Sequence, residues 1–196
     1  MKIRRLGFAL AAVIATAAAL APAGAASAAS AASGRQVSRG AASVALRPSG
    51  LPRSAPGEIR NRQNRGCVDV VSEEGFLKPG THIQMYHCTG AIEQQWIVPP
   101  IDASDTIFEL ISERSGLCVT GNFNASPGTL VTQQLCSTSF LGDLWRMLPV
   151  STATSTYFMQ NAATGLCADI VNGSTADHAR IEEMPCNGDK SQQFVF

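Results

Sequence analysis

Short apolar stretches recur through the last two-thirds of the chain, and residues typical of turns separate them. Two of these stretches alternate apolar with polar side chains, at Ile83-Gln84-Met85-Tyr86 and Gln95-Trp96-Ile97-Val98. A period of two is typical of a half-buried strand, and the Gly, Pro, Asn and Ser residues between the stretches favour turns. The pattern predicts an all-β domain.

The stretches belong to three copies of one unit. Each unit has a first cysteine, a second cysteine about twenty residues later, and a large aromatic residue eight or nine positions beyond it. Successive first cysteines are 51 and 49 residues apart, successive second cysteines 48 and 50, and successive aromatics 49. The three sets are Cys67, Cys118 and Cys167, then Cys88, Cys136 and Cys186, and finally Trp96, Trp145 and Phe194.

A repeat of about four strands and fifty residues suits two architectures. A propeller closes with four or more blades, whereas this chain has three units. We therefore predict a β-trefoil with three pseudo-symmetric repeats of about 49 residues, at about 58–100, 101–149 and 150–196. The closing aromatics would pack in one shared core.

All six cysteines lie within these units, and an even number in an exported chain favours disulfides. Six cysteines allow 15 connectivities, of which local pairing respects the repeat. We predict the pairs Cys67–Cys88, Cys118–Cys136 and Cys167–Cys186. A zinc site is the weaker interpretation, because there is no C-x-x-C and the three histidines are not spaced as a ligand set.

The first 28 residues have the three-part form of a secretory signal peptide. Basic residues precede an apolar run, 6–21, and small residues follow it, with the predicted cut after Ala28. A retained anchor is the alternative, but a run of about 16 residues is shorter than the roughly 20 that a span needs. We expect a secreted, extracellular protein without a membrane span, in which a flexible basic linker, 29–57, precedes the domain, 58–196.

The charges are unevenly distributed along the chain. From Gly66 onward there are five basic and 14 acidic side chains, a formal charge of −9. Such a domain repels a phosphate backbone, so nucleic acid is not an expected partner. Ten of the 15 Lys and Arg residues lie at or before Arg65. Two roles stay open for the basic linker: attraction to anionic cell-wall polymers, and contact with the acidic domain.

The ends of the first and third units carry short motifs. The first unit has Cys67-Val68-Asp69 and Gln94-Gln95-Trp96, the third has Cys167-Ala168-Asp169 and Gln192-Gln193-Phe194, and the second retains only Leu144-Trp145. Over residues 59–196 these units resemble the ricin B-chain type lectin repeats, with their Cys-x-Asp and Gln-x-Trp motifs. The resemblance implies a β-trefoil that binds glycans, in a secreted, stand-alone bacterial form.

In the first unit the resemblance implies a complete sugar site. Asp69 would accept hydrogen bonds from two adjacent ring hydroxyls, Tyr86 would stack on the apolar face of the sugar, and Gln84 and Gln94 would orient the acid or bind the sugar. Glu93 stands where the family commonly has Asn. An acceptor therefore replaces a donor, which affects the choice of sugar.

The other two units depart further from the family pattern. The third keeps Asp169 and Gln192, but Glu182 and Met184 stand at the positions of Gln84 and Tyr86 and leave no stacking surface. The second has Thr120, Thr132 and Gln134 at the three corresponding positions, so we predict no sugar site there.

Structural roles are the alternative for each of these residues. Asp69 and Asp169 would then cap turns, Gln94 and Gln192 would satisfy backbone groups, and Tyr86 would only pack. For Gln192 and Gln95 the structural role is the favoured one.

The overall prediction is a carbohydrate-binding protein for galactose- or xylose-type glycans, acting mainly through the first repeat. No nucleophile, metalloprotease or phosphate-loop motif occurs, so we expect no enzyme, no cofactor and no metal. We also expect a monomer. The alternative is a trefoil that has lost sugar binding and serves as a protein-interaction or inhibitor scaffold, through loops such as 121–128.

Overall fold

A computed structural model describes residues 53–104, 106–137, 139–151 and 154–196. The predicted signal peptide and the linker up to residue 52 lie outside these residues. The described residues form short β-strands and 3-10 helical turns, with no α-helix among them. The prediction of an all-β fold is confirmed.

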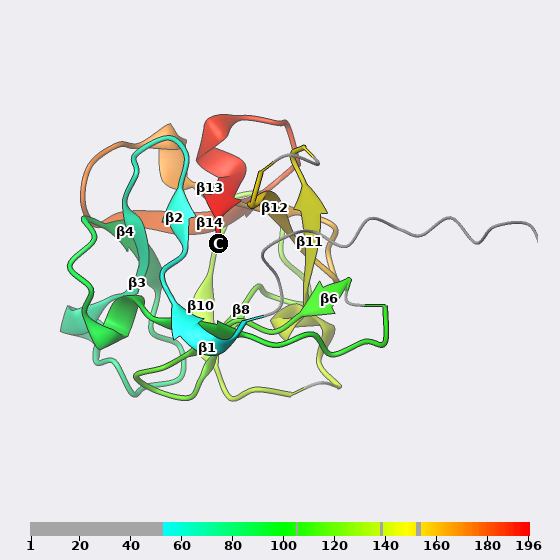
Figure 1. Ribbon diagram of the computed structural model, residues 1–196, viewed down its shortest axis with the longest axis horizontal. Helices are drawn as coiled ribbons and strands as arrows, with labels where there is room; N and C mark the ends of the chain where they lie inside the picture. Colours follow the sequence, from blue (N-terminus) through cyan, green and yellow to red (C-terminus); the bar gives the residue numbers. More distant parts are fainter. Residues whose placement is uncertain (1–52, 105, 138, 152–153) are drawn as a thin grey trace, which may run out of the picture. The chain divides into compact units, whose positions relative to one another are not determined.

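The strands follow the three units (Figure 1). The first unit holds β1 (Arg53–Gly57), β2 (Arg60–Asn61), β3 (Cys67–Val70), β4 (Ile83–Tyr86) and β5 (Trp96–Val98). The second holds β6 (Ile107–Phe108), β7 (Ile111–Ser112), β8 (Cys118–Thr120), β9 (Thr129–Leu130), β10 (Thr132–Gln134) and β11 (Trp145–Pro149). The third holds β12 (Thr156–Asn161), β13 (Cys167–Ile170), β14 (Ala179–Met184) and β15 (Gln193–Val195).

Short 3-10 helices occur at matching places in the units. One precedes each closing aromatic strand: η2 (Ile92–Gln94), η3 (Leu141–Asp143) and η5 (Lys190–Gln192). Two others, η1 (Ser72–Glu74) and η4 (Val171–Gly173), follow β3 and β13. The threefold repeat of the sequence is therefore also a repeat of local structure.

Two antiparallel sheets connect the units. One has the order β1-β5-β7-β8-β10, and the other runs β13-β14-β4-β3-β2-β15-β12-β11-β6 with β9 paired to β14. Each unit contributes one hairpin after its first cysteine: β3–β4, β8–β10 and β13–β14. Pairs such as β4 with β14 join different units, so no unit forms its sheet alone.

The closing aromatics pack at the centre, as predicted. Trp96, Trp145 and Phe194 have no exposed surface. The two indole N–H groups donate to the carbonyls of Val68 and Val119, each at 2.9 Å. Burying a tryptophan this way removes its large apolar surface from water without losing its hydrogen bond. The fold resembles a trefoil because each unit supplies one such residue to a common core.

The three predicted disulfides are present. Cys67–Cys88, Cys118–Cys136 and Cys167–Cys186 span 21, 18 and 19 residues. Loops of this size each stabilise the fold by about 3 kcal/mol when chain entropy is the only term considered. Each bond ties the start of a hairpin to the loop beyond its second strand.

The domain begins earlier than the sequence predicts. Residues 53–57, the end of the expected linker, form β1, which pairs with β5. The composition of this segment, with Pro56 and Gly57, favours a linker. As β1 pairs only with β5, it is an edge strand, where a proline is tolerated.

Candidate functional site

A pocket of about 210 Å³ lies against the β3–β4 hairpin of the first unit. Asp69 is directly opposite Gln84 in the antiparallel register, so their side chains share one face of the sheet. Tyr86 lies two residues further along β4 and therefore on the same face. All three line the pocket, and the structure brings them together as predicted.

Asp69 forms the floor of this first-repeat pocket. Only 8% of its surface is exposed, and Gln84 Nε2 donates to its Oδ1 at 2.9 Å. Burial raises the pKa of Asp69, hydrogen bonds from Gln84 and Gln94 lower it in part, and the nearby Glu93 charge raises it further. A carboxylate that has lost water but keeps free lone pairs is a strong acceptor for ligand hydroxyls.

The Tyr86 ring contacts two histidine rings. The rings of His87 and His178 have centroids 4.2 and 4.8 Å from the tyrosine ring. His178 belongs to the third unit and also lines the pocket, with Nδ1 3.3 Å from Gln84 Oε1. The first-repeat pocket is thus built from two units, which the sequence analysis did not predict.

The loop that carries His178 is fastened to β4. His178 has a left-handed backbone, φ 65°, and its N–H donates to the Met85 carbonyl at 2.9 Å. Next to it, Asp177 accepts from the backbone N–H of His87 and contacts the His87 ring, both at 2.8 Å. The contacts with His87 lower the pKa of Asp177. These bonds hold His178 against Tyr86.

Glu93 lines the pocket on the side facing the second unit. Its carboxylate lies 3.5 Å from Arg114 Nε, and the Arg114 guanidinium lies 5.3 Å from the centre of the Phe76 ring. Phe76 is also a lining residue. Glu93 is therefore an acceptor that a cation already engages.

Gln94 and Gln192 are fully buried. Gln94 does not line the first-repeat pocket, and Gln192 does not line the corresponding pocket of the third repeat. Gln94 donates to the His87 carbonyl at 3.0 Å and accepts from Thr89 N–H at 2.8 Å. Gln192 bonds in the same way with Pro185 and Asn187. Both amides hold the loop after the hairpin and orient the aspartate beside it. The sequence analysis offered binding or orientation for Gln94, and its burial favours orientation.

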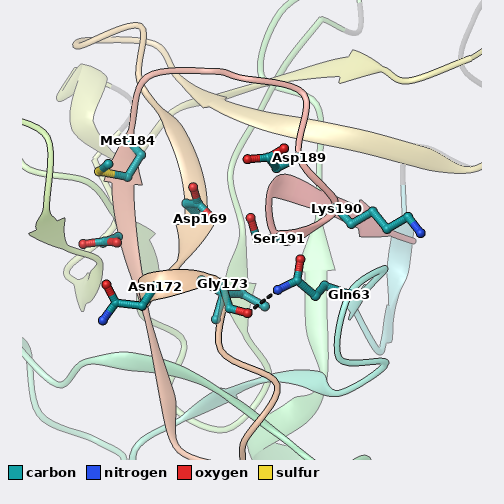
Figure 2. Close-up of a pocket in the computed structure, with 10 residues that line it drawn as sticks. Gln63, Asp169, Asn172, Gly173, Met184, Asp189, Lys190 and Ser191 are labelled. Atoms are coloured by element: carbon teal, nitrogen blue, oxygen red, sulfur yellow. Dashed lines mark hydrogen bonds between the residues drawn. The ribbon is translucent and has the colours of Figure 1, made fainter.

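The third-repeat pocket is the larger one, at about 590 Å³ (Figure 2). Asp169 is opposite Glu182 across the β13–β14 register, and Met184 occupies the place that Tyr86 has in the first unit. Gln192 Nε2 donates to Asp169 Oδ2 at 2.9 Å. This pocket has the acid that the sequence predicts, and no aromatic residue lines it.

The second-repeat pocket, about 390 Å³, has a neutral floor of Thr120, Thr132 and Gln134. A carboxylate lies beside this floor, that of Asp143, which is fully buried at the position of Gln94. It accepts from Thr120 Oγ1 at 2.7 Å and Ser137 N–H at 2.9 Å, and burial raises its pKa. Asp143 was not predicted from the sequence, although it precedes Trp145 by two residues as Gln94 precedes Trp96.

Phe140 supplies an aromatic wall to this second-repeat pocket. It comes from the loop before η3, not from the strand position that carries Tyr86 in the first unit. Thr120, Thr132 and Gln134 themselves provide neither a carboxylate nor an aromatic platform, and the absence of a sugar site in this unit stays a prediction. An aromatic surface is nevertheless present.

Two other kinds of site find little support in the described residues. One group of potential metal ligands, Glu58 with Cys67 and Cys88, has both of its sulfurs in a disulfide. Within the described ranges, no helix has the length and apolar character needed to cross a membrane.

Comparisons with known proteins agree with this geometry. Residues 55–194 match the family model of the ricin-type beta-trefoil lectin domain. Comparison with curated proteins gave no match. Among solved structures, the designed three-fold symmetric protein ThreeFoil is 24% identical with a TM-score of 0.63, covering 70% of this chain and 94% of that one.

Two natural proteins share the fold at lower identity. The Macrolepiota procera ricin B-like lectin in complex with lactose is 14% identical with a TM-score of 0.61, covering 74% of this chain and 96% of that one. An exo-beta-1,3-galactanase from Clostridium thermocellum is 17% identical with a TM-score of 0.65, covering 74% of this chain and 30% of that one. This chain therefore spans less than a third of the galactanase.

Proposed function

Because the chain belongs to the ricin-type beta-trefoil lectin family, we propose that it is a carbohydrate-binding protein whose main site is the first-repeat pocket. The observation that carries the proposal is the convergence of Asp69, Gln84 and Tyr86 on one face of the β3–β4 hairpin. Membership of a lectin family supports carbohydrate binding in general, and the assignment to this pocket is our own.

A pyranose ring needs two surfaces from its partner. Its apolar face of C–H groups packs on an aromatic ring, and its hydroxyls need fixed hydrogen-bond acceptors and donors. Tyr86, whose ring contacts two histidine rings, supplies the first surface, and the Asp69 carboxylate supplies the second. Neither the second-repeat nor the third-repeat pocket has both an aromatic platform and a carboxylate among its lining residues.

We infer a galactose- or xylose-type ligand. Two adjacent hydroxyls of such a ring can donate to the Asp69 carboxylate, and Glu93 adds a further acceptor in the pocket. The lactose complex of the Macrolepiota procera lectin supports a galactose-type ligand. One shallow site gives a dissociation constant of roughly 0.1–10 mM for a free monosaccharide.

We propose binding without catalysis. Glycoside hydrolysis needs an acid and a second carboxylate on opposite sides of the scissile bond. In the first-repeat pocket Asp69 is bonded to Gln84 and Glu93 is engaged by Arg114. The galactanase match covers less than a third of that enzyme, which also supports a binding role.

We further propose that the protein is secreted. The six cysteines of the described domain are all in disulfides, with no free thiol, which is typical of oxidising compartments. The residues with the form of a signal peptide support the same location.

The proposal is tested by a glycan array probed with the oxidised protein and with Asp69→Ala and Asp169→Ala variants of verified fold. We expect galactose- or xylose-terminated glycans to bind wild type and Asp169→Ala, and to lose binding with Asp69→Ala. Binding that is insensitive to Asp69→Ala, or no bound glycan, would contradict the assignment.

A protein-interaction role is the second candidate, and one surface favours it. Large apolar side chains of the second unit are exposed: Phe123, Leu130, Leu135, Phe140 and Leu141, with 51% of Phe123 and 72% of Leu135 accessible. Phe123, in the 121–128 loop, packs on Phe140 with ring centres 6.0 Å apart. Exposed apolar surface of this kind marks contact sites. Under this alternative, the Phe123→Ser variant would lose partner binding, whereas the Asp69→Ala variant would bind the partner as wild type does.

A further inference from the structure

The third-repeat pocket has an excess of negative charge. Three carboxylates line it, from Asp169, Glu182 and Asp189, together with one cation, Lys190. Figure 2 shows the Lys190 side chain extending away from Asp169, on the far side of η5. The acids therefore face the pocket without a cation between them.

Asp169 has one oxygen without a hydrogen-bond partner. Its residue surface is only 7% exposed, and Gln192 occupies Oδ2. Its Oδ1 is buried and receives no hydrogen bond from any described residue. A buried carboxylate oxygen without a donor is costly. Because Asp169 lines the pocket, a bound ligand can supply the missing donor.

Comparison with the first unit shows what has changed. There, the residue opposite the aspartate is Gln84, whose Nε2 donates to Asp69. In the third unit the residue opposite Asp169 is Glu182, which cannot donate when ionised. Burial raises the pKa of Glu182, and the Asp169 charge raises it further, while the Asn172 N–H lowers it in part. The donor that the fold supplies in one unit is absent in the other.

The two carboxylates of Asp169 and Glu182 fit a cationic ligand. The number of carboxylate groups decides whether a metal ion or an ammonium group fits better. Calcium takes six to eight oxygen ligands, whereas among the described residues the three carboxylates of this pocket do not bring their oxygens within 4.8 Å of one another. A protonated amine presents three N–H donors and forms charge-assisted hydrogen bonds with carboxylates. An ammonium group suits two acceptors better than a metal does.

The absence of an aromatic wall points the same way. Met184 replaces Tyr86, so a ring held here gains little from stacking and needs a stronger polar anchor. The volume of about 590 Å³ leaves room for a sugar ring beside the carboxylates. We propose that the third-repeat pocket binds an amino sugar through its protonated amino group, held by Asp169 and Glu182. The proposal rests on the lectin function and gives this pocket a ligand class different from that of the first-repeat pocket.

Calorimetric titration with galactosamine, N-acetylgalactosamine and galactose tests this assignment. The measurement uses the Asp69→Asn variant, so that the first-repeat pocket does not contribute. We expect galactosamine to bind at least about tenfold more tightly than its N-acetyl form, the effect of one charge-assisted hydrogen bond. Adding Glu182→Gln should remove the difference, and Glu113→Gln, which neutralises an exposed acid outside the pockets, should preserve it.

Other outcomes overturn the proposal. Equal affinity for galactosamine and its N-acetyl form would do so, as would an unchanged preference in the Glu182→Gln variant. Blocking of galactosamine by calcium would show a metal site, and equal binding of N-α-acetyl-lysine amide would show a peptide site. Binding of galactose to wild type, measured in parallel, reports on the lectin proposal by itself.

Discussion

Three aspartates, Asp69, Asp143 and Asp169, lie beneath the three pockets, and each has a different set of partners. Asp69 accepts from Gln84 on the opposite strand, Asp143 from Thr120 and a backbone N–H, and Asp169 from Gln192. Asp69 therefore lines a pocket beside an aromatic ring, Asp143 is enclosed by its own unit, and Asp169 keeps an oxygen without a hydrogen-bond donor. Differences of single residues give three pockets of different chemistry on one repeated backbone.

Asp69→Asn separates binding from stability. The change keeps the shape of the side chain and removes the charge, so sugar affinity should fall about tenfold or more. Because burial raises the pKa of Asp69, its ionised form destabilises the fold at neutral pH. The melting temperature of the variant should thus equal or exceed that of wild type. A variant that loses both affinity and several degrees of stability would show that Asp69 is structural.

The affinity of the first-repeat pocket should also depend on pH. The ionised Asp69 is the acceptor, so affinity falls as the pH drops through its pKa. That pKa is raised by burial and by the Glu93 charge, which places the midpoint above the pH of about 3.9 usual for aspartate. Glu93→Gln should move the midpoint to lower pH. Affinities measured from pH 3 to 7 in both proteins test this, and an unshifted midpoint would contradict it.

Glu183 provides a test of a buried charge outside the pockets. It is fully buried and accepts from Asn122 N–H at 3.0 Å and Thr164 Oγ1 at 2.9 Å. Burial raises its pKa, with these bonds lowering it in part. Glu183 contributes most to stability at pH values below its pKa in the unfolded chain, which is about 4.3. That contribution is lost as the pH rises through the higher pKa that Glu183 has in the folded protein.

The variant Glu183→Gln should remove this pH dependence. Gln133 occupies the same place in the second unit and bonds Ser115 as Glu183 bonds Thr164. The variant should melt on the order of 3 °C above wild type at pH 7.5, with no difference at pH 4. Melting curves at the two pH values decide, and a variant less stable at pH 7.5 would show that the charge itself is needed.

At the scale of elements, the first-repeat pocket joins a hairpin to a loop of another unit. The β3–β4 hairpin supplies Asp69, Gln84 and Tyr86, and the loop before β14 supplies His178. The second and third units are joined in a similar way where Gly121 packs closely against the Glu183 carboxylate. A Cβ atom at position 121 would lie 2.7 Å from that carboxylate. Contacts between units therefore shape the sites as well as the core.

His178→Ala tests this division of the site. Loss of the ring contact with Tyr86 should weaken sugar binding roughly two- to tenfold, the value of an aromatic pair. His82→Ala is the matched control, because the His82 ring contacts Glu74 and lies outside the pocket. Titrations of both variants with one sugar give the comparison. Equal affinities would remove His178 from the site.

At the scale of the whole molecule, the repeat made the fold predictable. Three registered pairs of cysteines and three aromatics at 49-residue spacing allow few arrangements, and the disulfides and core follow them. The resemblance to the lectin repeats placed Asp69 and Gln84 in one site, and in the structure the two residues are directly opposite each other.

What escaped prediction depends on contacts between distant segments or on altered motifs. His178 meets Tyr86 across 92 residues of sequence, through a loop with a left-handed backbone that no periodicity reveals. Asp143 was hidden because the glutamine of the motif had become an acid. Strand β1 was hidden by a composition typical of linkers, since its pairing depends on β5.

The most direct test of the central claim is a ¹H–¹⁵N NMR titration of the isotope-labelled protein with galactose and then xylose. At least one of the two sugars should shift the Gln84 side-chain amide signals and the backbone signals of Asp69, Tyr86 and His178. These four residues line one pocket, so their shifts should follow a single binding curve. Shifts centred on Phe140 and Leu130, or a spectrum unchanged by both sugars, would contradict the claim that the first-repeat pocket is the sugar site.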